Sequence, residues 1–384
     1  YPAAVATTFD LNFNTIAEDF TFTRGSEATF VNAQGLIQST NELGSELVTN
    51  GDFATDSDWT KQSDWTISNG TANCDGNSSV NYIYQSLGIT LINKTYKITY
   101  TISNFVSGSV AVGFGSGLNQ PLGTQRNANG TYTEYLTKTS TSQLFGLRSS
   151  FFTGSIDNVS VKEYITATNT PRLDYSTGAE AFLLEPQSTN LITYSEDFSN
   201  ASWFKENATI SSNSIISPDG VLNADKFIPS NVSTYHDVYK NITTVDGLIY
   251  SFSLFAKKGE IKYLQLYFSS NDALGNPYSN FDLQNGTSFN SSSNITSSII
   301  ELSNGWYKCS VTITSTTTLM GCVINPILTY SATRAQFYQG DGTSGLYIFG
   351  AQLENQSYAT SYIPTSGASA TRNQELCNNA TPVI

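Results

Sequence analysis

The chain has few positive charges. It carries 18 Lys and Arg residues against 31 Asp and Glu residues, which gives a formal net charge of -13. Neutralisation of phosphates by Lys and Arg supplies most of the affinity of proteins for nucleic acids, and this chain offers no basic surface for it. We therefore expect no nucleic-acid partner.

Histidine is almost missing, which limits the catalytic chemistry available. His236 is the single histidine, and it lies between Tyr235 and Asp237 in a strand-like run. Any Ser-His-Asp or Cys-His arrangement would have to use it, and a structural histidine is the simpler interpretation. The closely spaced acidic pattern of jelly-roll glucanases and a phosphate-binding glycine loop before a helix are also absent. We expect no enzymatic activity.

Cysteines are few and widely separated, at Cys74, Cys309, Cys322 and Cys377. They lack the paired short spacings of zinc sites and of dense disulfide scaffolds. We interpret them as small buried thiols, although Cys309 and Cys322 flank a possible hairpin and could be neighbours. No apolar run approaches the length of a membrane span, and we expect no membrane insertion.

Strand-forming and turn-forming residues dominate the remainder. Aromatic residues reach 12% of the chain while charged residues make up only 13%. Thr, Ser, Asn, Gly and Tyr fill much of what is left, a balance that favours strands and turns over helices. The sequence predicts an all-β protein.

One sequence pattern occurs twice. Residues 47–53 (LVTNGDF) precede Trp59, and residues 191–198 (LITYSEDF) precede Trp203. Each copy runs through alternating strand-like sequence to an acidic closing strand, at 154–161 and at 345–354. Self-similarity at such a long period predicts two duplicated modules, in which Trp59 and Trp203 are structural.

Turn signals divide the chain into five parts. We predict N-terminal strands in residues 1–41, a first module at 42–165, a connector at 166–189, a second module at 190–365 and a polar tail at 366–384. Strands are predicted at 9–24, 96–102, 109–114, 131–136, 143–147, 155–161, 250–256, 263–268, 281–287, 306–313, 335–338 and 347–353. Each module is predicted to be a jelly-roll β-sandwich.

Two resemblances refine this prediction. Residues 47–59 with 155–161 resemble the ends of jelly-roll carbohydrate-binding modules. Residues 22–31 (FTRGSEATFV) and 35–38 (GLIQ) resemble a segment of bacteriophage structural proteins, chiefly tail-fibre and head-fibre proteins. Further segments of that family have counterparts at 170–175 (TPRLDY), 184–191, 194–203, 337–342, 350–354 and 362–365.

The phage-like pattern is interrupted. In that family the segment like 35–38 is normally followed at once by the segment like 170–175, whereas here residues 41 to about 168 separate them. The resemblance therefore implies that the first module is inserted near the N-terminus of the second, and that the strands in residues 1–41 pack with the C-terminal module. Insertion into a surface loop is well tolerated because few contacts are broken.

Sugar binding on a β-sandwich needs aromatic faces for stacking and nearby polar groups for the hydroxyls. The predicted carbohydrate-binding residues are Trp65, Tyr82, Tyr84, Gln85, Tyr235, Tyr263 and Tyr267. Core packing is the competing interpretation of each aromatic, because alternation turns half of them inward. Asp52 and Asp157 could meet at the sandwich edge, where related modules often hold a structural calcium. Solvated or turn-capping acids are the competing interpretation, and we expect no cofactor other than this calcium.

These observations lead to one functional hypothesis with two alternatives. The resemblance implies a virion structural protein at the phage surface, with outward-facing modules that bind host or environmental glycans. Other virion proteins would be its partners, and a homotrimer would multiply weak contacts. The alternatives are a structural capsid or tail cement protein without sugar binding, and a bacterial secreted adhesin or accessory polysaccharide-binding protein.

Overall fold

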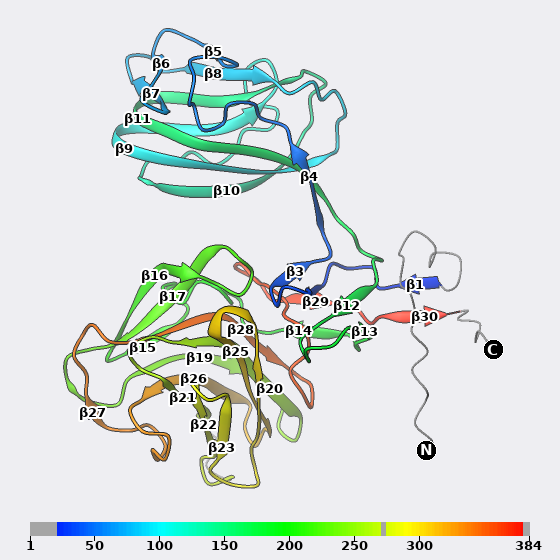
Figure 1. Ribbon diagram of the computed structural model, residues 1–384, viewed down its shortest axis with the longest axis vertical. Helices are drawn as coiled ribbons and strands as arrows, with labels where there is room; N and C mark the ends of the chain where they lie inside the picture. The colour runs from blue at the N-terminus through cyan, green and yellow to red at the C-terminus, as the bar shows by residue number, and fades with distance from the viewer. Residues whose placement is uncertain (1–20, 270–273, 379–384) are drawn as a thin grey trace. The chain divides into compact units, whose positions relative to one another are not determined.

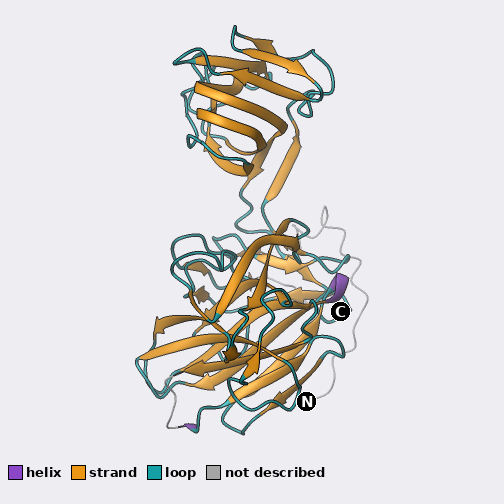
Figure 2. Ribbon diagram, turned by 90° about the vertical axis from the view of Figure 1, so that its left-hand side faces the viewer, coloured by secondary structure: helices purple, strands orange, loops and turns teal. Residues whose placement is uncertain are grey.

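The computed structural model describes residues 21–269 and 274–378. The chain divides into two compact units (Figure 1): residues 41–166, which we call the inserted unit, and residues 1–40 with 167–384, which we call the discontinuous unit. Every long element in the described ranges is a β-strand, and none is an α-helix (Figure 2). The prediction of an all-β protein built from jelly-roll β-sandwich modules is confirmed. The strand predicted from residue 9 to residue 20 lies outside the described residues.

The inserted unit is a two-layer sandwich around one apolar core. One layer has the strand order β6-β7-β11-β9-β10, and the other has the order β5-β8-β11-β9. β4 pairs with the end of β11. The strands are β4 (Glu42–Glu46), β5 (Thr60–Lys61), β6 (Trp65–Ser68), β7 (Thr71–Asp75), β8 (Asn81–Ser86), β9 (Thr95–Phe114), β10 (Gly130–Thr137) and β11 (Leu144–Ile165).

Strands β9 and β11 each contribute to both layers. Residues 95–102 of β9 pair with β10, whereas residues 109–114 pair with residues 145–150 of β11. The strands predicted at 96–102 and 109–114 are thus parts of one bent strand, β9. Those predicted at 143–147 and 155–161 are likewise parts of β11. The bend depends on Gly108 (φ 74°), because a Cβ there would lie 2.0 Å from the carbonyl oxygen of Phe151.

The discontinuous unit contains two six-stranded sheets that enclose the largest apolar core. The first sheet has the order β15 (Phe204–Glu206), β19 (Asp237–Thr243), β26 (Leu319–Ile327), β21 (Tyr263–Ser269), β22 (Tyr278–Asp282), β23 (Thr287–Asn290). The second has the order β16 (Ala208–Ile216), β17 (Leu222–Pro229), β28 (Leu346–Glu354), β20 (Ile249–Lys258), β25 (Trp306–Thr314), β24 (Thr296–Glu301). The strand predicted at 335–338 is wrong: only β27 (Tyr338–Gln339) forms there, paired with β18 (Ser233–Thr234).

Four further short antiparallel pairs lie in the same unit, two between distant segments and two within local hairpins. They are β1 (Thr21–Thr23) with β30 (Leu376–Asn378), β2 (Thr29–Val31) with β3 (Ile37–Ser39), β12 (Arg172–Asp174) with β13 (Ala181–Leu183), and β14 (Ser188–Asn190) with β29 (Ala370–Arg372). The expected polar tail is therefore paired as far as residue 378, and the expected connector carries three strands. Terminal segments are usually ordered only where they are held by burial or pairing. This one is held, because Arg372 and Glu375 are buried.

The chain leaves the discontinuous unit after Thr40 and returns to it at Ala167, and these two residues are in contact. The Thr40 hydroxyl donates to the Ala167 carbonyl oxygen at 3.1 Å. Arg24 Nη2 donates to both, to Thr40 Oγ1 at 3.1 Å and to the Ala167 carbonyl at 3.2 Å. Residues 41–166 thus leave and re-enter at one place, as an insertion requires.

The two units share one topology. The order β6-β7-β11-β9-β10 matches β16-β17-β28-β20-β25, and the order β5-β8-β11-β9 matches β15-β19-β26-β21. The repeated sequence is also repeated in geometry: Trp59 Nε1 donates to the Asn50 carbonyl at 2.9 Å, and Trp203 Nε1 donates to the Tyr194 carbonyl at 2.8 Å. Both tryptophans are buried, so their predicted structural role is confirmed.

Candidate functional site

A cleft of about 490 Å³ opens on the outer face of the first sheet of the discontinuous unit. Its volume lies in the range of small-ligand sites. Strands β15, β19, β21 and β26 and the segment before β27 supply its walls. It is lined by Glu206, Tyr235, Asp237, Tyr239, Asn241, Tyr267, Ser269, Val323, Arg334 and Ala335.

Strand alternation decides which side chains reach the cleft. Val238, Leu264 and Leu266 point into the core, so their neighbours in sequence point outward. The outward set therefore includes Asp237 and Tyr239 on β19. Tyr267 on β21 is brought beside them through β26, since Tyr239 and Tyr267 both pair with Val323.

Asp237 forms the floor of the cleft and is held by two donors. The Tyr267 hydroxyl donates to Oδ2 at 2.8 Å, and Asn325 Nδ2 donates to Oδ1 at 2.5 Å. Burial raises the pKa of Asp237, while these two hydrogen bonds act against the rise. Burial and the nearby Asp237 charge raise the pKa of Tyr267 well above its ordinary range, so its phenol remains a donor.

Aromatic rings form the rim of the cleft. Phe204 is 51% exposed and stacks on Tyr239, with centroids 5.1 Å apart and an interplanar angle of 17°. Phe337 is 70% exposed and meets Tyr235 edge-on at 5.6 Å. The Tyr235 hydroxyl donates to Glu206 Oε1 at 2.7 Å, and this bond is the main cause that raises the pKa of Tyr235.

Arg334 supplies the positive charge of the cleft. Its guanidinium carbon lies 4.3 Å from the centroid of the Tyr267 ring, and its buried Nε has no hydrogen-bond partner. Gln265 holds the backbone around it, because Gln265 Nε2 donates to the Thr333 carbonyl and the Ala335 amide donates to Gln265 Oε1. The cleft thus combines carboxylate acceptors, a guanidinium and aromatic rings.

The cleft gathers only part of the predicted sugar-binding set. Tyr235 and Tyr267 line it, whereas Tyr263 lies outside the lining and faces Tyr330, with centroids 6.0 Å apart. Sequence reasoning missed Glu206, Asp237 and Arg334. Alternation around the predicted Tyr235 could have indicated Asp237, but nothing local indicated Glu206 or Arg334, which arrive from other elements.

In the inserted unit two of the four predicted residues are wrong for sugar contact. Trp65 is 3% exposed and stacks against Phe152 in the core. Gln85 is buried and exchanges two hydrogen bonds with the Thr49 backbone, so its amide is fully used. Both belong to the inward-facing positions of their strands. Tyr82 and Tyr84 alternate with buried residues of β8 and are partly exposed on the outer face.

The predicted calcium ligands keep local partners. Asp52 Oδ1 accepts from the Ala54 amide at 3.3 Å, and Asp157 Oδ1 accepts from the Asn158 amide at 2.6 Å. The Val159 amide donates to the Gly51 carbonyl, which brings the two segments together. The described part of the chain contains no group of three or more His, Cys, Asp or Glu residues that could hold a metal. Calcium here stays a prediction.

His236 has a structural environment. It is fully buried, with Nδ1 at 2.7 Å from the Asn207 carbonyl oxygen and Nε2 at 3.2 Å from that of Tyr338. Its ring lies 4.6 Å from that of Tyr338. Both nitrogens are therefore engaged by backbone carbonyls.

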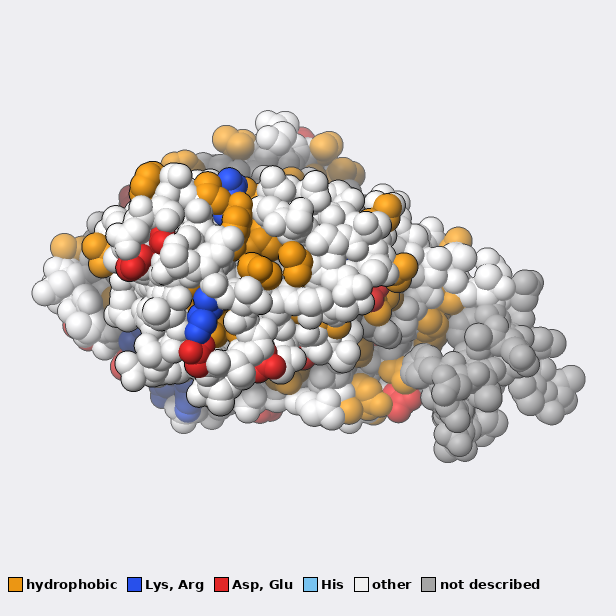
Figure 3. Space-filling model, turned by 90° about the horizontal axis from the view of Figure 1, so that it is seen from above, with side chains coloured by type: hydrophobic (Ala, Val, Ile, Leu, Met, Phe, Trp, Pro, Cys, Tyr) orange, Lys and Arg blue, Asp and Glu red, His pale blue; other side chains and the backbone are white. Residues whose placement is uncertain are grey.

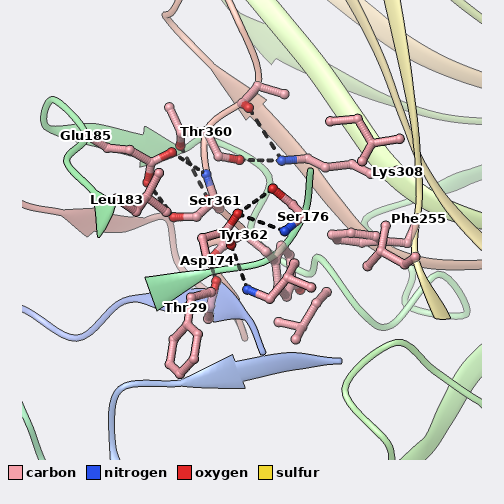
Figure 4. Close-up of a pocket in the computed structure, with 16 residues that line it drawn as sticks. Thr29, Asp174, Ser176, Leu183, Glu185, Phe255, Lys308, Thr360, Ser361 and Tyr362 are labelled. Carbon is pink, nitrogen blue, oxygen red and sulfur yellow. Dashed lines mark hydrogen bonds between the residues drawn. The ribbon is translucent and has the colours of Figure 1, made fainter. Parts of the chain in front are cut away.

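A smaller cavity of about 110 Å³ lies between β2, β12 and the segment 359–362 (Figure 4). Its polar walls are satisfied internally: Asp174 accepts from the Val31 and Ser176 amides, and Lys308 Nζ donates to the Thr360 carbonyl at 2.5 Å. Burial lowers the pKa of Lys308. The cavity has room for a few water molecules and leaves no polar group for a ligand.

No family model and no curated protein sequence matches the chain. Among solved structures, the N-terminal CBM22-1-CBM22-2 tandem domain of Paenibacillus barcinonensis Xyn10C is 14% identical, and the match covers 82% of this chain and 99% of that domain at a TM-score of 0.27. An anti-sigma factor domain-containing protein is 10% identical, with 84% and 99% covered and a TM-score of 0.15. Both scores are too low to transfer either protein's properties to this chain. Among the described residues no helix has the length and apolar character of a membrane span.

Proposed function

We propose that this protein binds glycans, and that the cleft of the discontinuous unit is a saccharide site. The observation that carries the proposal is the convergence of three tyrosine rings, two carboxylates and the Arg334 guanidinium in one cleft of ligand size. Sugars need this combination because their rings have apolar C–H faces and polar hydroxyl edges.

Each wall has a distinct role in this proposal. The Phe204–Tyr239 stack offers a flat face to a sugar ring, and Phe337 offers a second one beside Tyr235. Glu206 accepts hydrogen bonds from sugar hydroxyls through Oε2, because Oε1 already accepts one from the Tyr235 hydroxyl. Arg334 lines the cleft, and its guanidinium donates to ring or hydroxyl oxygens. Asp237 acts as a positioning residue that orients Tyr267.

The biological setting extends the sequence resemblance to phage fibre proteins. In this proposal the protein belongs to a virion surface, contacts other virion proteins and assembles as a homotrimer that presents several weak sites at once. Sedimentation of the full chain at micromolar concentration tests the assembly: a trimer is expected, and a monomer contradicts it.

The glycan site is tested by a glycan array followed by calorimetry on the full chain. Tyr239→Ala is expected to weaken binding of the best neutral oligosaccharide about tenfold, the loss of one good contact. Tyr358→Ala is the matched control, because Tyr358 is 47% exposed and lies outside the cleft lining. An array without binding at high concentration would favour the cement alternative, and turnover of a polysaccharide would favour an enzyme.

A further inference from the structure

The strand register locates a second face in the inserted unit that corresponds to the cleft. Phe204 follows Trp203 and pairs with Tyr239, and Thr60 follows Trp59 and pairs with Tyr84. Tyr84 therefore occupies the position of Tyr239, the cleft residue on which Phe204 stacks. This correspondence depends only on pairing along equivalent strands.

The same register assigns the neighbouring positions. Two residues along β8, Tyr82 occupies the position of Asp237. Tyr82 pairs with Arg148, just as the β19–β26 register places Asp237 opposite Asn325. Arg148 therefore stands where Asn325 holds the cleft carboxylate.

Compared with the cleft, the face of the inserted unit lacks a negative charge and carries an additional positive one. A carboxylate is replaced by the phenol of Tyr82, and an amide is replaced by the guanidinium of Arg148. Arg148 is partly exposed, its buried Nε has no hydrogen-bond partner, and it forms no ion pair with a described carboxylate. The unmatched group on this face is a cation with a planar fork of donors.

The face is also shallower than the cleft. Gly113 pairs with Gly146 and so takes the position of Tyr267, with no ring to stand up from the sheet. The Leu118 carbonyl oxygen lies 2.1 Å from where a Gly113 Cβ would be, so the loop 115–121 closes that side. Figure 3 shows one side of the molecule, where hydrophobic side chains gather near the middle and Lys or Arg side chains lie close to them.

We propose that Tyr82, Tyr84 and Arg148 form a second binding face that takes an acidic saccharide. The tyrosine rings contact the sugar face, and Arg148 receives the carboxylate in a charge-assisted pair. The net charge of -13 opposes an anion only weakly, because screening at physiological salt limits distant charges to about 8 Å. The proposal is independent of the saccharide site in the cleft, since a different unit carries it.

Calorimetry on the full chain with trigalacturonic acid tests this face, and the methyl ester of the same trisaccharide is the uncharged comparison. The acid is expected to bind, with an affinity that falls as salt rises, and the ester is expected to bind at least about tenfold more weakly. Arg148→Met should remove the preference for the acid. Tyr84→Ala should weaken binding of the acid by about the same factor.

Two controls distinguish this face from a general charge effect and from the cleft. Lys97→Met removes a positive charge from the other sheet of the same unit and should leave binding unchanged. Tyr239→Ala should leave the acid bound while it weakens neutral sugars in the cleft. The proposal is overturned if the acid does not bind, if the ester binds equally well, or if folded Arg148→Met and Tyr84→Ala variants keep the wild-type affinity for the acid.

Discussion

Arg172 and Glu375 form a two-point ion pair across 203 residues of sequence. Arg172 Nε donates to Glu375 Oε1 at 2.8 Å, and Nη2 donates to Oε2 at 2.6 Å. Both side chains are fully buried, and Arg24 adds a further bond to Glu375 at 2.9 Å. The pair ties the segment after the inserted unit to the C-terminal segment.

We predict that Arg172→Met destabilises the discontinuous unit by about 3 kcal/mol, because buried Glu375 and Glu185 lose charge-assisted hydrogen bonds that Arg24 and Arg372 replace only in part. Urea unfolding measures the loss. Glu260→Gln is the matched control, since the Lys226–Glu260 pair in the same unit is largely exposed on the Glu260 side and such pairs contribute little. Equal unfolding midpoints for the two variants would contradict a stabilising role for the buried pair.

Glu196 should make stability depend on pH. Burial raises its pKa to about 7 from its ordinary value of 4.5, against an opposing hydrogen bond from Tyr362. Since the folded-state pKa lies above the unfolded-state value, Glu196 lowers stability as pH rises through the interval between them. Glu196→Gln is therefore expected to raise the melting temperature at about pH 8 and to change it little at about pH 4. A larger gain in melting temperature at about pH 4 than at about pH 8 would contradict the predicted direction of the pH dependence.

Gly108 should be irreplaceable at the bend of β9. Gly108→Ala places a Cβ 2.0 Å from a backbone oxygen at φ 74°, and we expect a loss of about 3 kcal/mol. Gly70→Ala separates the two causes, because Gly70 has φ 73° and nothing within 4 Å of the position that a Cβ would take. It should lose only about 1 kcal/mol, the cost of the left-handed backbone alone. Urea unfolding of the inserted unit measures both variants, and equal losses would mean that backbone strain, not contact, makes Gly108 necessary.

The discontinuous unit should fold without the inserted unit. Thr40 and Ala167 are joined by a hydrogen bond, so a short Gly-Ser linker can replace residues 41–166. We expect the shortened chain to unfold cooperatively and to retain the neutral-sugar affinity of the full chain. Circular dichroism and calorimetry test this, and a chain that does not fold would mean that the two units depend on each other.

Local patterns predicted part of the site. The predicted Tyr235 and Tyr267 both line the cleft, and sugar contact by either stays a prediction. The same reasoning failed for Trp65 and Gln85. A one-residue difference in register turns a side chain from solvent to core, and the aromatic content of a strand does not reveal its register.

Long-range contacts were beyond local prediction. Arg334 reaches the cleft from the segment before β27, and Asn325 reaches Asp237 across a strand pair separated by 88 residues. The ionic contacts of Arg24 and Arg172 likewise join segments that no local period relates. The phage-like segments contain both arginines, but only the fold shows that they share Glu375.

The sequence by itself determined the all-β architecture, the duplication and the structural role of the two tryptophans, because composition, alternation and repetition are local properties of the chain. The tertiary structure decided which aromatic rings face outward, which charges meet in the core, and that one unit presents Asp237 and Asn325 where the other presents Tyr82 and Arg148. Those outcomes depend on strand register and on contacts between distant segments, and no stretch of sequence encodes either of them alone.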